Sequence, residues 1–249
     1  ILGLTISASS ALNLTAIYFP YITIFVFVVF LAGILLGKIF NIEKRLALLI
    51  TSGTAICGAS AMAAISPLIK AKPRELLVSM AIIFSFNALA IALFPLIGNS
   101  IGMTDVSFGA WAAMAIHDTS SVVGAAMAFG GDALETATTL KLGRTIWLIP
   151  LIVILGIFYK DPKNAKPKFP MFVFIFILAI VLGAVLNFEE QTLSAFDSIS
   201  QIFLVAALFC IGAQISLKAI KQIDMRTFSV AFVLWTFTLI FSYSLINLF

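Results

Sequence analysis

Charged residues are scarce in this chain of 249 residues. They make up 10% of the sequence, whereas a typical soluble domain has about 25%. Hydrophobic residues make up 62%, and the mean hydropathy is +1.16. This composition excludes a soluble globular protein and indicates an integral membrane protein. Because the apolar runs do not alternate with polar residues at period two, they predict an all-α transmembrane bundle rather than a β-barrel.

Histidine and cysteine are almost absent. The chain has one histidine and two cysteines, Cys57 and Cys210, both in apolar segments where cysteine acts as a small core residue. No Cys/His cluster has the spacing of a metal site, and no phosphate-binding P-loop is present. We therefore expect no metal, no cofactor and no ATP-driven pumping. The net charge of +4 is spread over short loops, so we expect no nucleic-acid partner.

Apolar runs of spanning length recur along the chain, since roughly twenty apolar residues cross a bilayer core. The predicted spans are 21–37, 76–97, 134–159, 171–186, 202–215 and 228–248. We expect residues 7–19 to form an interfacial connector and residues 1–249 to form a single transmembrane transporter domain. Because the chain opens on Ile1 inside apolar sequence, we also expect it to lack earlier helices.

Two polar stretches interrupt this pattern. Residues 51–60 read TSGTAICGAS, and residues 115–124 read AIHDTSSVVG with the only histidine. Broken helix at membrane depth is tolerated only where protein buries it or water reaches it, and paired interruptions mark the binding site of a transporter. We therefore predict that the two broken segments, 46–69 and 108–130, line a substrate site.

Loop charges predict the topology. The basic loops, expected in the cytoplasm, are 38–45, 70–74, 160–168 and 218–226. The loops expected outside, together with the C-terminus, are 98–107, 130–135 and 187–197. This assignment requires each broken segment to be a re-entrant hairpin, and each half has about twelve residues, enough for half a bilayer. The alternative is that both cross as discontinuous helices, which would place 70–74 outside.

Short sequence echoes suggest inverted repeats. Residues 2–7 resemble 211–216, each before a span, and residues 57–63 resemble 123–128. On the predicted topology the members of the first pair face opposite ways across the membrane. Inverted repeats around a site at the midplane are a recurring plan of transporters.

The first break offers hydroxyl and amide groups that could bind an anion, because half-helix N-termini direct positive partial charge toward such a site. The candidate substrate-binding residues here are Thr51, Ser52, Gly53, Thr54, Gly58 and Ser60. The alternative is that these small residues only allow helices to pack closely in the membrane.

The second break holds His117 and Asp118. An ionisable residue at membrane depth is costly and indicates function, and histidine titrates near physiological pH. We predict that the two residues couple transport to H⁺ or Na⁺, and that Thr119 and Ser120 share the substrate lining. The alternative is that Asp118 only caps the following half-helix while His117 packs.

Lys141 and Arg144 lie three residues apart, on one face of the span 134–159. Arginine suits bidentate binding of sulfate-like or carboxylate oxygens, so we predict that both residues bind substrate. The alternative is that both side chains snorkel to the outer interface. Asn87 is an isolated polar residue of the span 76–97 that either faces the same cavity or bonds across helices.

These motifs carry a family resemblance. The stretch GTAICGASA from Gly53, the His117–Asp118 pair and KLGRTIWLIP from Lys141 resemble the YeiH-like bacterial inner-membrane proteins named as sulfate exporters. That family is grouped with the cation–proton antiporter and anion transporter superfamily. The resemblance covers essentially the whole chain, and it implies inverted repeats, discontinuous helices and about three further helices at the N-terminus.

The leading hypothesis is a secondary transporter of a small anion, such as sulfate or an organosulfonate, coupled to H⁺ or Na⁺ in the inner membrane. An alternative is a cation–proton antiporter with Asp118 as the ion carrier. A hypothesis of another class is an intramembrane serine hydrolase, with Ser60 as nucleophile and His117 as base. We expect a transporter and not an enzyme, with no catalytic residues.

Overall fold

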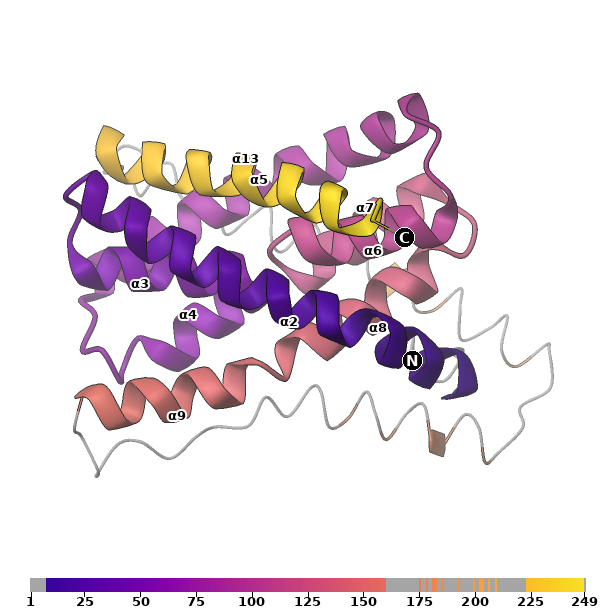
Figure 1. Ribbon diagram of the computed structural model, residues 1–249, viewed down its shortest axis with the longest axis horizontal. Coiled ribbons are helices and arrows are strands. Elements are labelled where there is room, and N and C mark those ends of the chain that lie inside the picture. The colour runs from indigo at the N-terminus through magenta and orange to yellow at the C-terminus, as the bar shows by residue number, and fades with distance from the viewer. Residues whose placement is uncertain are drawn as a thin grey trace.

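The structure is a computed structural model. It describes residues 8–159 and 223–248, together with scattered helical positions between 175 and 209. The described elements are α2 (Ala8–Ile39), α3 (Lys44–Ser52), the π-helix η1 (Gly53–Cys57), α4 (Ala59–Ile65), α5 (Pro73–Ser100), α6 (Asp105–Ala115), α7 (Thr119–Phe129), α8 (Ala133–Thr145), α9 (Leu148–Tyr159) and α13 (Met225–Ile246). All of them are helical, as the composition predicts (Figure 1).

Four helical stretches are long and apolar enough to cross a membrane. They are Leu12–Ile39, Pro73–Ser100, Ala133–Tyr159 and Met225–Ile246, and they confirm four of the predicted spans. The predicted spans 171–186 and 202–215 fall largely outside the described residues, as do the loops 160–168 and 187–197.

The first of these helices corrects one expectation. Residues 7–19 were expected to form an interfacial connector, but α2 is continuous from Ala8 to Ile39 and contains Pro20. The apolar residues Leu12 and Leu14 extend the hydrophobic run by two turns before the proline, so a single long helix forms. Pro20 removes one backbone donor without ending the helix.

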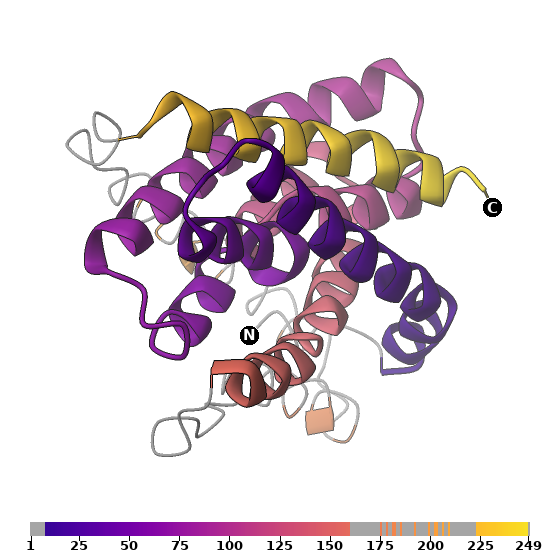
Figure 2. The same cartoon turned by 60° about the vertical axis from the view of Figure 1, so that its left-hand side comes forward.

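The span 133–159 is broken once. It consists of α8 and α9, with a turn at Ile146 and Trp147 between them. Pro150 occupies the first turn of α9, where a missing backbone N–H costs nothing because that donor has no partner in the helix. The polar half of this span is therefore a separate helix, α8, and α9 lies at the edge of the bundle in both ribbon views (Figures 1 and 2).

Both broken segments are re-entrant hairpins, the first of the two alternatives. Glu43 before α3 and Lys72 after α4 line one cavity, so the first segment leaves at the end where it enters. The Asp132 amide after α7 donates to the Asp105 carboxylate at the start of α6, so the second segment does the same. Figure 1 shows the two hairpins entering from opposite ends and meeting in the middle.

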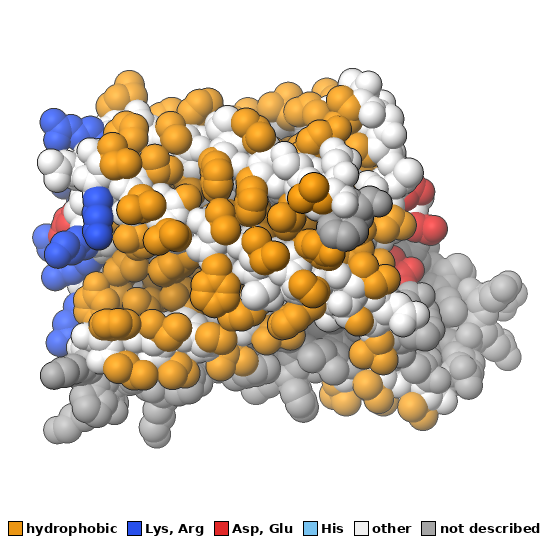
Figure 3. All heavy atoms as spheres, in the orientation of Figure 1, with side chains coloured by type: hydrophobic (Ala, Val, Ile, Leu, Met, Phe, Trp, Pro, Cys, Tyr) orange, Lys and Arg blue, Asp and Glu red, His pale blue; other side chains and the backbone are white. Residues whose placement is uncertain are grey.

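Charge separates these two ends as the loops predict. Figure 3 shows Lys and Arg side chains gathered at one end, with some acidic atoms among them, and only acidic charged side chains in view at the other end, with a hydrophobic belt between the two. Asp224 before α13 lines the same cavity as Lys72, and the C-terminus lies toward the opposite end (Figure 1). The loops 38–45 and 70–74 therefore share one end, which we call the basic end.

The sequence echoes do not mark equivalent positions within the hairpins. Gly58 lies at the break of the first hairpin, with φ of 59°, whereas its counterpart Gly124 lies inside α7. The resemblance of 57–63 to 123–128 therefore reflects similar small residues rather than a matching register. The other pair, 2–7 and 211–216, lies outside the described residues.

Candidate functional site

Arg144 lies where the two hairpins meet, and its side chain is fully buried. Its guanidinium Nε donates to the carbonyl of Ile56 in the first hairpin. In the second hairpin, Nη1 donates to the carbonyl of Met114, and Nη2 donates to those of Ile116 and His117, at 3.4 Å each. One side chain of α8 therefore joins both hairpins.

Lys141 stands one turn earlier on α8 and is also fully buried. Its Nζ donates to the carbonyl of Ile116 at 2.5 Å and to that of Ala113 at 3.5 Å. The last carbonyls of a helix have no intrahelical partner, and the helix dipole places negative partial charge there. The two cations therefore satisfy the C-terminal ends of η1 and α6.

This arrangement excludes snorkelling of either cation to the interface. The Phe25 ring of α2 further covers the guanidinium, with its centroid 5.6 Å from Cζ of Arg144. Arginine has five N–H donors and lysine has three, so the bonds to described residues leave one donor on each side chain. Binding of substrate by Lys141 and Arg144 stays a prediction, and it would use these remaining donors.

The tips of the two hairpins touch at Gly58. This residue has φ of 59° and ψ of −127°, a conformation that only glycine adopts readily. A Cβ placed on Gly58 would lie 3.4 Å from the backbone of His117 and Asp118. The two sequence motifs that predicted the site are therefore in contact, although Gly58 and His117 are 59 positions apart in the chain.

Asp118 caps the second half-helix, as one of the two alternatives for this residue proposes. Its carboxylate accepts from the backbone amides of Ser120 at 3.1 Å and Ser121 at 3.4 Å, at the N-terminus of α7. The side chains of Thr119 and Ser120 are half-buried beside it. Capping fixes the position of the carboxylate at the tip, and an additional role in ion coupling stays a prediction.

His117 is bonded across helices to Asn87. Its backbone amide and its ring Nδ1 lie 3.3 Å and 3.1 Å from Oδ1 of Asn87 on α5. The imidazole also contacts Phe86 and Trp235, with ring centroids 6.4 Å and 6.5 Å away. Ser60 is exposed and does not bond this ring, because Nε2 of His117 has no hydrogen-bond partner. The dyad of a serine hydrolase is therefore not formed.

The hydroxyls of the first break fall into two groups. Ser52 donates back to the carbonyl of Leu48 on its own helix. Thr51 and Thr54 are buried with no hydrogen bond to their hydroxyl oxygens, and Thr51 packs so close to Gly33 of α2 that an added Cβ there would lie 2.4 Å from Oγ1. Thr51 therefore serves close packing, as the alternative holds, and Thr54 keeps a free polar group near the tip.

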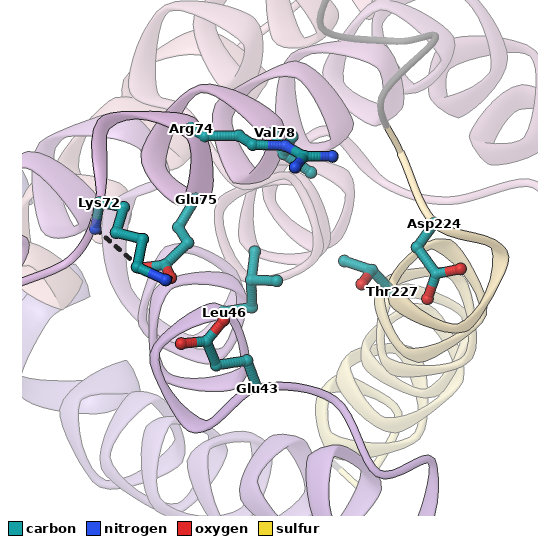
Figure 4. A pocket seen from close by; sticks show the side chains of 8 residues that line it. All are labelled: Glu43, Leu46, Lys72, Arg74, Glu75, Val78, Asp224 and Thr227. Carbon is teal, nitrogen blue, oxygen red and sulfur yellow. Dashed lines mark hydrogen bonds and ion pairs between the residues drawn. The ribbon is translucent and has the colours of Figure 1, made fainter.

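A cavity of about 210 Å³ opens at the basic end, between α5 and α13. Figure 4 shows its charged side chains, which come from segments far apart in the sequence. The lining residues are Glu43, Leu46, Lys72, Arg74, Glu75, Val78, Asp224 and Thr227. The stacked rings of Phe86 and Trp235, 4.8 Å apart, lie about two turns further along the same two helices, where both contact the imidazole of His117.

The sequence missed two kinds of residue in this site. The acceptors at Ile56, Met114 and Ile116 are backbone carbonyls, which no sequence pattern identifies. Phe25 is one of 24 phenylalanines, and nothing in the sequence distinguishes it as the ring over Arg144. Asn87, by contrast, could be found, because an isolated amide in an apolar span needs a partner.

The fold and the site define a class: a polytopic helical membrane protein in which two opposed re-entrant hairpins meet around buried cations. Within that class, the chain belongs to the family described as conserved hypothetical protein 698, whose model matches residues 1–231.

The relatives are named UPF0324 membrane proteins. The chain is 44% identical to one from Bacteroides thetaiotaomicron, over 80% of this chain and 60% of that protein. It is 38% identical to one from Vibrio vulnificus, over 94% of this chain and 76% of that protein. It therefore spans 60% of the length of the Bacteroides relative. No solved structure matches the chain.

Proposed function

We propose that this protein is a secondary transporter of a small anion, such as sulfate or an organosulfonate, with coupling to H⁺ or Na⁺. The single observation that carries the proposal is the burial of two cations where two half-helix pairs meet. Lys141 and Arg144 are both completely buried, and Asp118 is the carboxylate that caps the half-helix at the same tip.

A count of charge favours an anion. Two helix C-termini and two helix N-termini meet at the tips, and their partial charges of about half a unit each cancel to first order. The formal charges then decide the balance, and two cations against one carboxylate leave one positive charge. Burying an uncompensated charge is costly, so an anion that enters the site stabilises it.

We propose that the groups around this excess positive charge bind the anion. The hydroxyls of Thr119 and Ser120 and the backbone at Gly58 border the tips, while Lys141 and Arg144 each offer one donor beyond those that bind carbonyls. His117 and Asp118 carry the coupling ion in this proposal. We further propose that the protein lies in the bacterial inner membrane with its basic end in the cytoplasm and its C-terminus outside, consistent with the resemblance to sulfate exporters.

The test is uptake of radiolabelled sulfate and taurine by proteoliposomes that contain the complete protein. Thr119→Val removes one hydroxyl and leaves the bonds of Arg144 intact, so it separates substrate binding from folding. Because a hydrogen bond to a charged group contributes about 1.5–3 kcal/mol, we expect the KM to rise at least about tenfold. The matched control is Thr236→Val, a partly exposed threonine on α13 whose hydroxyl bonds the carbonyl of Phe232 on its own helix.

Each outcome decides between functions. Saturable anion uptake that weakens in Thr119→Val and not in Thr236→Val supports the proposal. If the wild-type protein moves neither anion but dissipates a sodium or pH gradient, the anion proposal is wrong, and cation–proton antiport through Asp118 replaces it.

A further inference from the structure

Asn87 holds the only histidine of the chain by two bonds. The amide oxygen Oδ1 lies 3.3 Å from the backbone nitrogen of His117 and 3.1 Å from its ring Nδ1. Both side chains are buried, with exposures of 0% and 1%. Because Asn87 belongs to α5 and His117 to the break between α6 and α7, this contact also anchors the tip of the second hairpin to a spanning helix.

The backbone bond decides which atom of the amide faces the ring. A backbone N–H can only donate, so the Asn87 atom opposite the His117 amide must be the carbonyl oxygen. The same oxygen faces Nδ1, and a hydrogen bond there requires the proton to be on Nδ1. In a neutral imidazole the other nitrogen, Nε2, is then a bare acceptor, and Nε2 is buried without a hydrogen-bond partner.

We propose that Asn87 is the positioning residue of His117: it fixes the neutral imidazole as the Nδ1–H tautomer and makes Nε2 the atom that gains and loses the proton. The tautomer follows from the hydrogen bonds alone, while its use in transport rests on the proposed function. When a proton arrives, Nε2 becomes N–H and the bond from Nδ1 to Asn87 stays. The hairpin tip therefore remains anchored throughout the proton cycle.

No other helix packed against His117 supplies a group that would select its tautomer, among the described residues. From α8, Arg144 bonds the carbonyl oxygen of His117 rather than its ring, and Lys141 bonds the carbonyls of Ala113 and Ile116. From α7, Asp118 is engaged with backbone amides. From α13, Trp235 contacts the ring with its aromatic face (Figure 1 places α13 beside α5). Among the described residues, only Asn87 hydrogen-bonds the imidazole.

A single histidine makes the tautomer directly measurable. This chain, labelled with ¹⁵N only in histidine, gives two ring nitrogen signals that need no assignment to a residue, because its 249 residues include one histidine. At a pH where the ring is neutral, we expect a protonated Nδ1 and a bare Nε2 in the wild-type protein. A protonated Nε2 with a bare Nδ1 overturns the proposal, and this measurement needs no variant that could fail to fold.

The variants Asn87→Ala and Asn87→Asp add the functional readout. Asn87→Ala is expected to lose the single tautomer and to give a mixture. Asn87→Asp places a carboxylate beside the ring, which favours the imidazolium, so the pH profile of transport should move upward by about one unit or more. The control is Asn99→Asp, an exposed position on the same helix, which should leave the tautomer and the profile unchanged.

The two proposals fail in different ways. A wild-type spectrum with the opposite tautomer refutes positioning by Asn87, whatever the transport assay gives. If the spectrum is as expected and the profile of Asn87→Asp matches that of the wild type, Asn87 positions His117, and proton coupling through His117 is wrong.

Discussion

Replacement of Arg144 by leucine tests whether this side chain holds the two hairpins together. The change removes the hydrogen bonds to the carbonyls of Ile56, Met114, Ile116 and His117. Each buried carbonyl left without a partner costs about 1–3 kcal/mol, while the loss of the buried guanidinium recovers part of its desolvation cost. The net destabilisation should resemble that of breaking a buried charge pair, about 3–5 kcal/mol.

The assay is thermal unfolding of the purified protein in detergent. One kcal/mol shifts the Tm of a protein of this size by about 2–4 °C, so we expect a fall of about 10 °C for Arg144→Leu. Arg144→Lys keeps the charge and offers fewer donors, so it should lie between Arg144→Leu and the wild type. Arg45→Leu is the control, because Arg45 makes only an exposed ion pair at 4.0 Å with Glu43, which is worth about 1 kcal/mol or less.

The refuting result is equally specific. If Arg144→Leu unfolds within about 2 °C of the wild type and still loses anion transport, Arg144 contributes little to stability and acts as a substrate ligand. If it unfolds early, while Arg144→Lys restores stability but not transport, the residue does both.

Three further tests address other parts of the structure. Gly33→Ala would place a Cβ 2.4 Å from a threonine oxygen of α3, so it should cost about 1–3 kcal/mol of stability. Gly143→Ala is the control, because its Cβ would lie 3.9 Å from the nearest atom, and it should leave stability unchanged or raise it. The Tm of each variant in thermal unfolding measures the difference. Asp118→Ala should lower the unfolding free energy by about 1 kcal/mol through loss of the N-cap, whereas Asp118→Asn should keep the cap. An impermeant maleimide added to intact spheroplasts should label Asp105→Cys and not Arg74→Cys, and the reverse result would invert the proposed topology.

The sequence predicted the hairpins because two of its signals agreed. Basic residues at 70–74 match those at 38–45, so charge alone indicated that the first broken segment returns to its starting end. Length gave the same prediction, because each half of a broken segment has about twelve residues, enough to cross only half of a bilayer. The limits of α2 could not be predicted as well, because residues 8–20 mix polar and apolar side chains and include Pro20, a pattern that fits a connector as well as a helix.

The site shows a sharper division. His117, Asp118, Lys141 and Arg144 could be chosen from sequence because charge at membrane depth is rare. Their partners could not, since each cation binds backbone carbonyls and Asp118 binds backbone amides. From the side chains alone, these charges were predicted to bind a substrate. In the structure, most of their hydrogen bonds go to backbone groups of the interrupted helices.

That division constrains how the protein can move. Interrupted helices at membrane depth need protein or water to satisfy their free carbonyls, and here α8 supplies the donors for both hairpins through Lys141 and Arg144. A rearrangement that pulled α8 away from either tip would expose several carbonyls at about 1–3 kcal/mol each. We therefore expect α8 and the two tips to move as one body. We expect access to the site to change instead between α5 and α13, which line the cavity of the basic end and carry the stacked Phe86 and Trp235 rings, because a change there breaks none of those bonds.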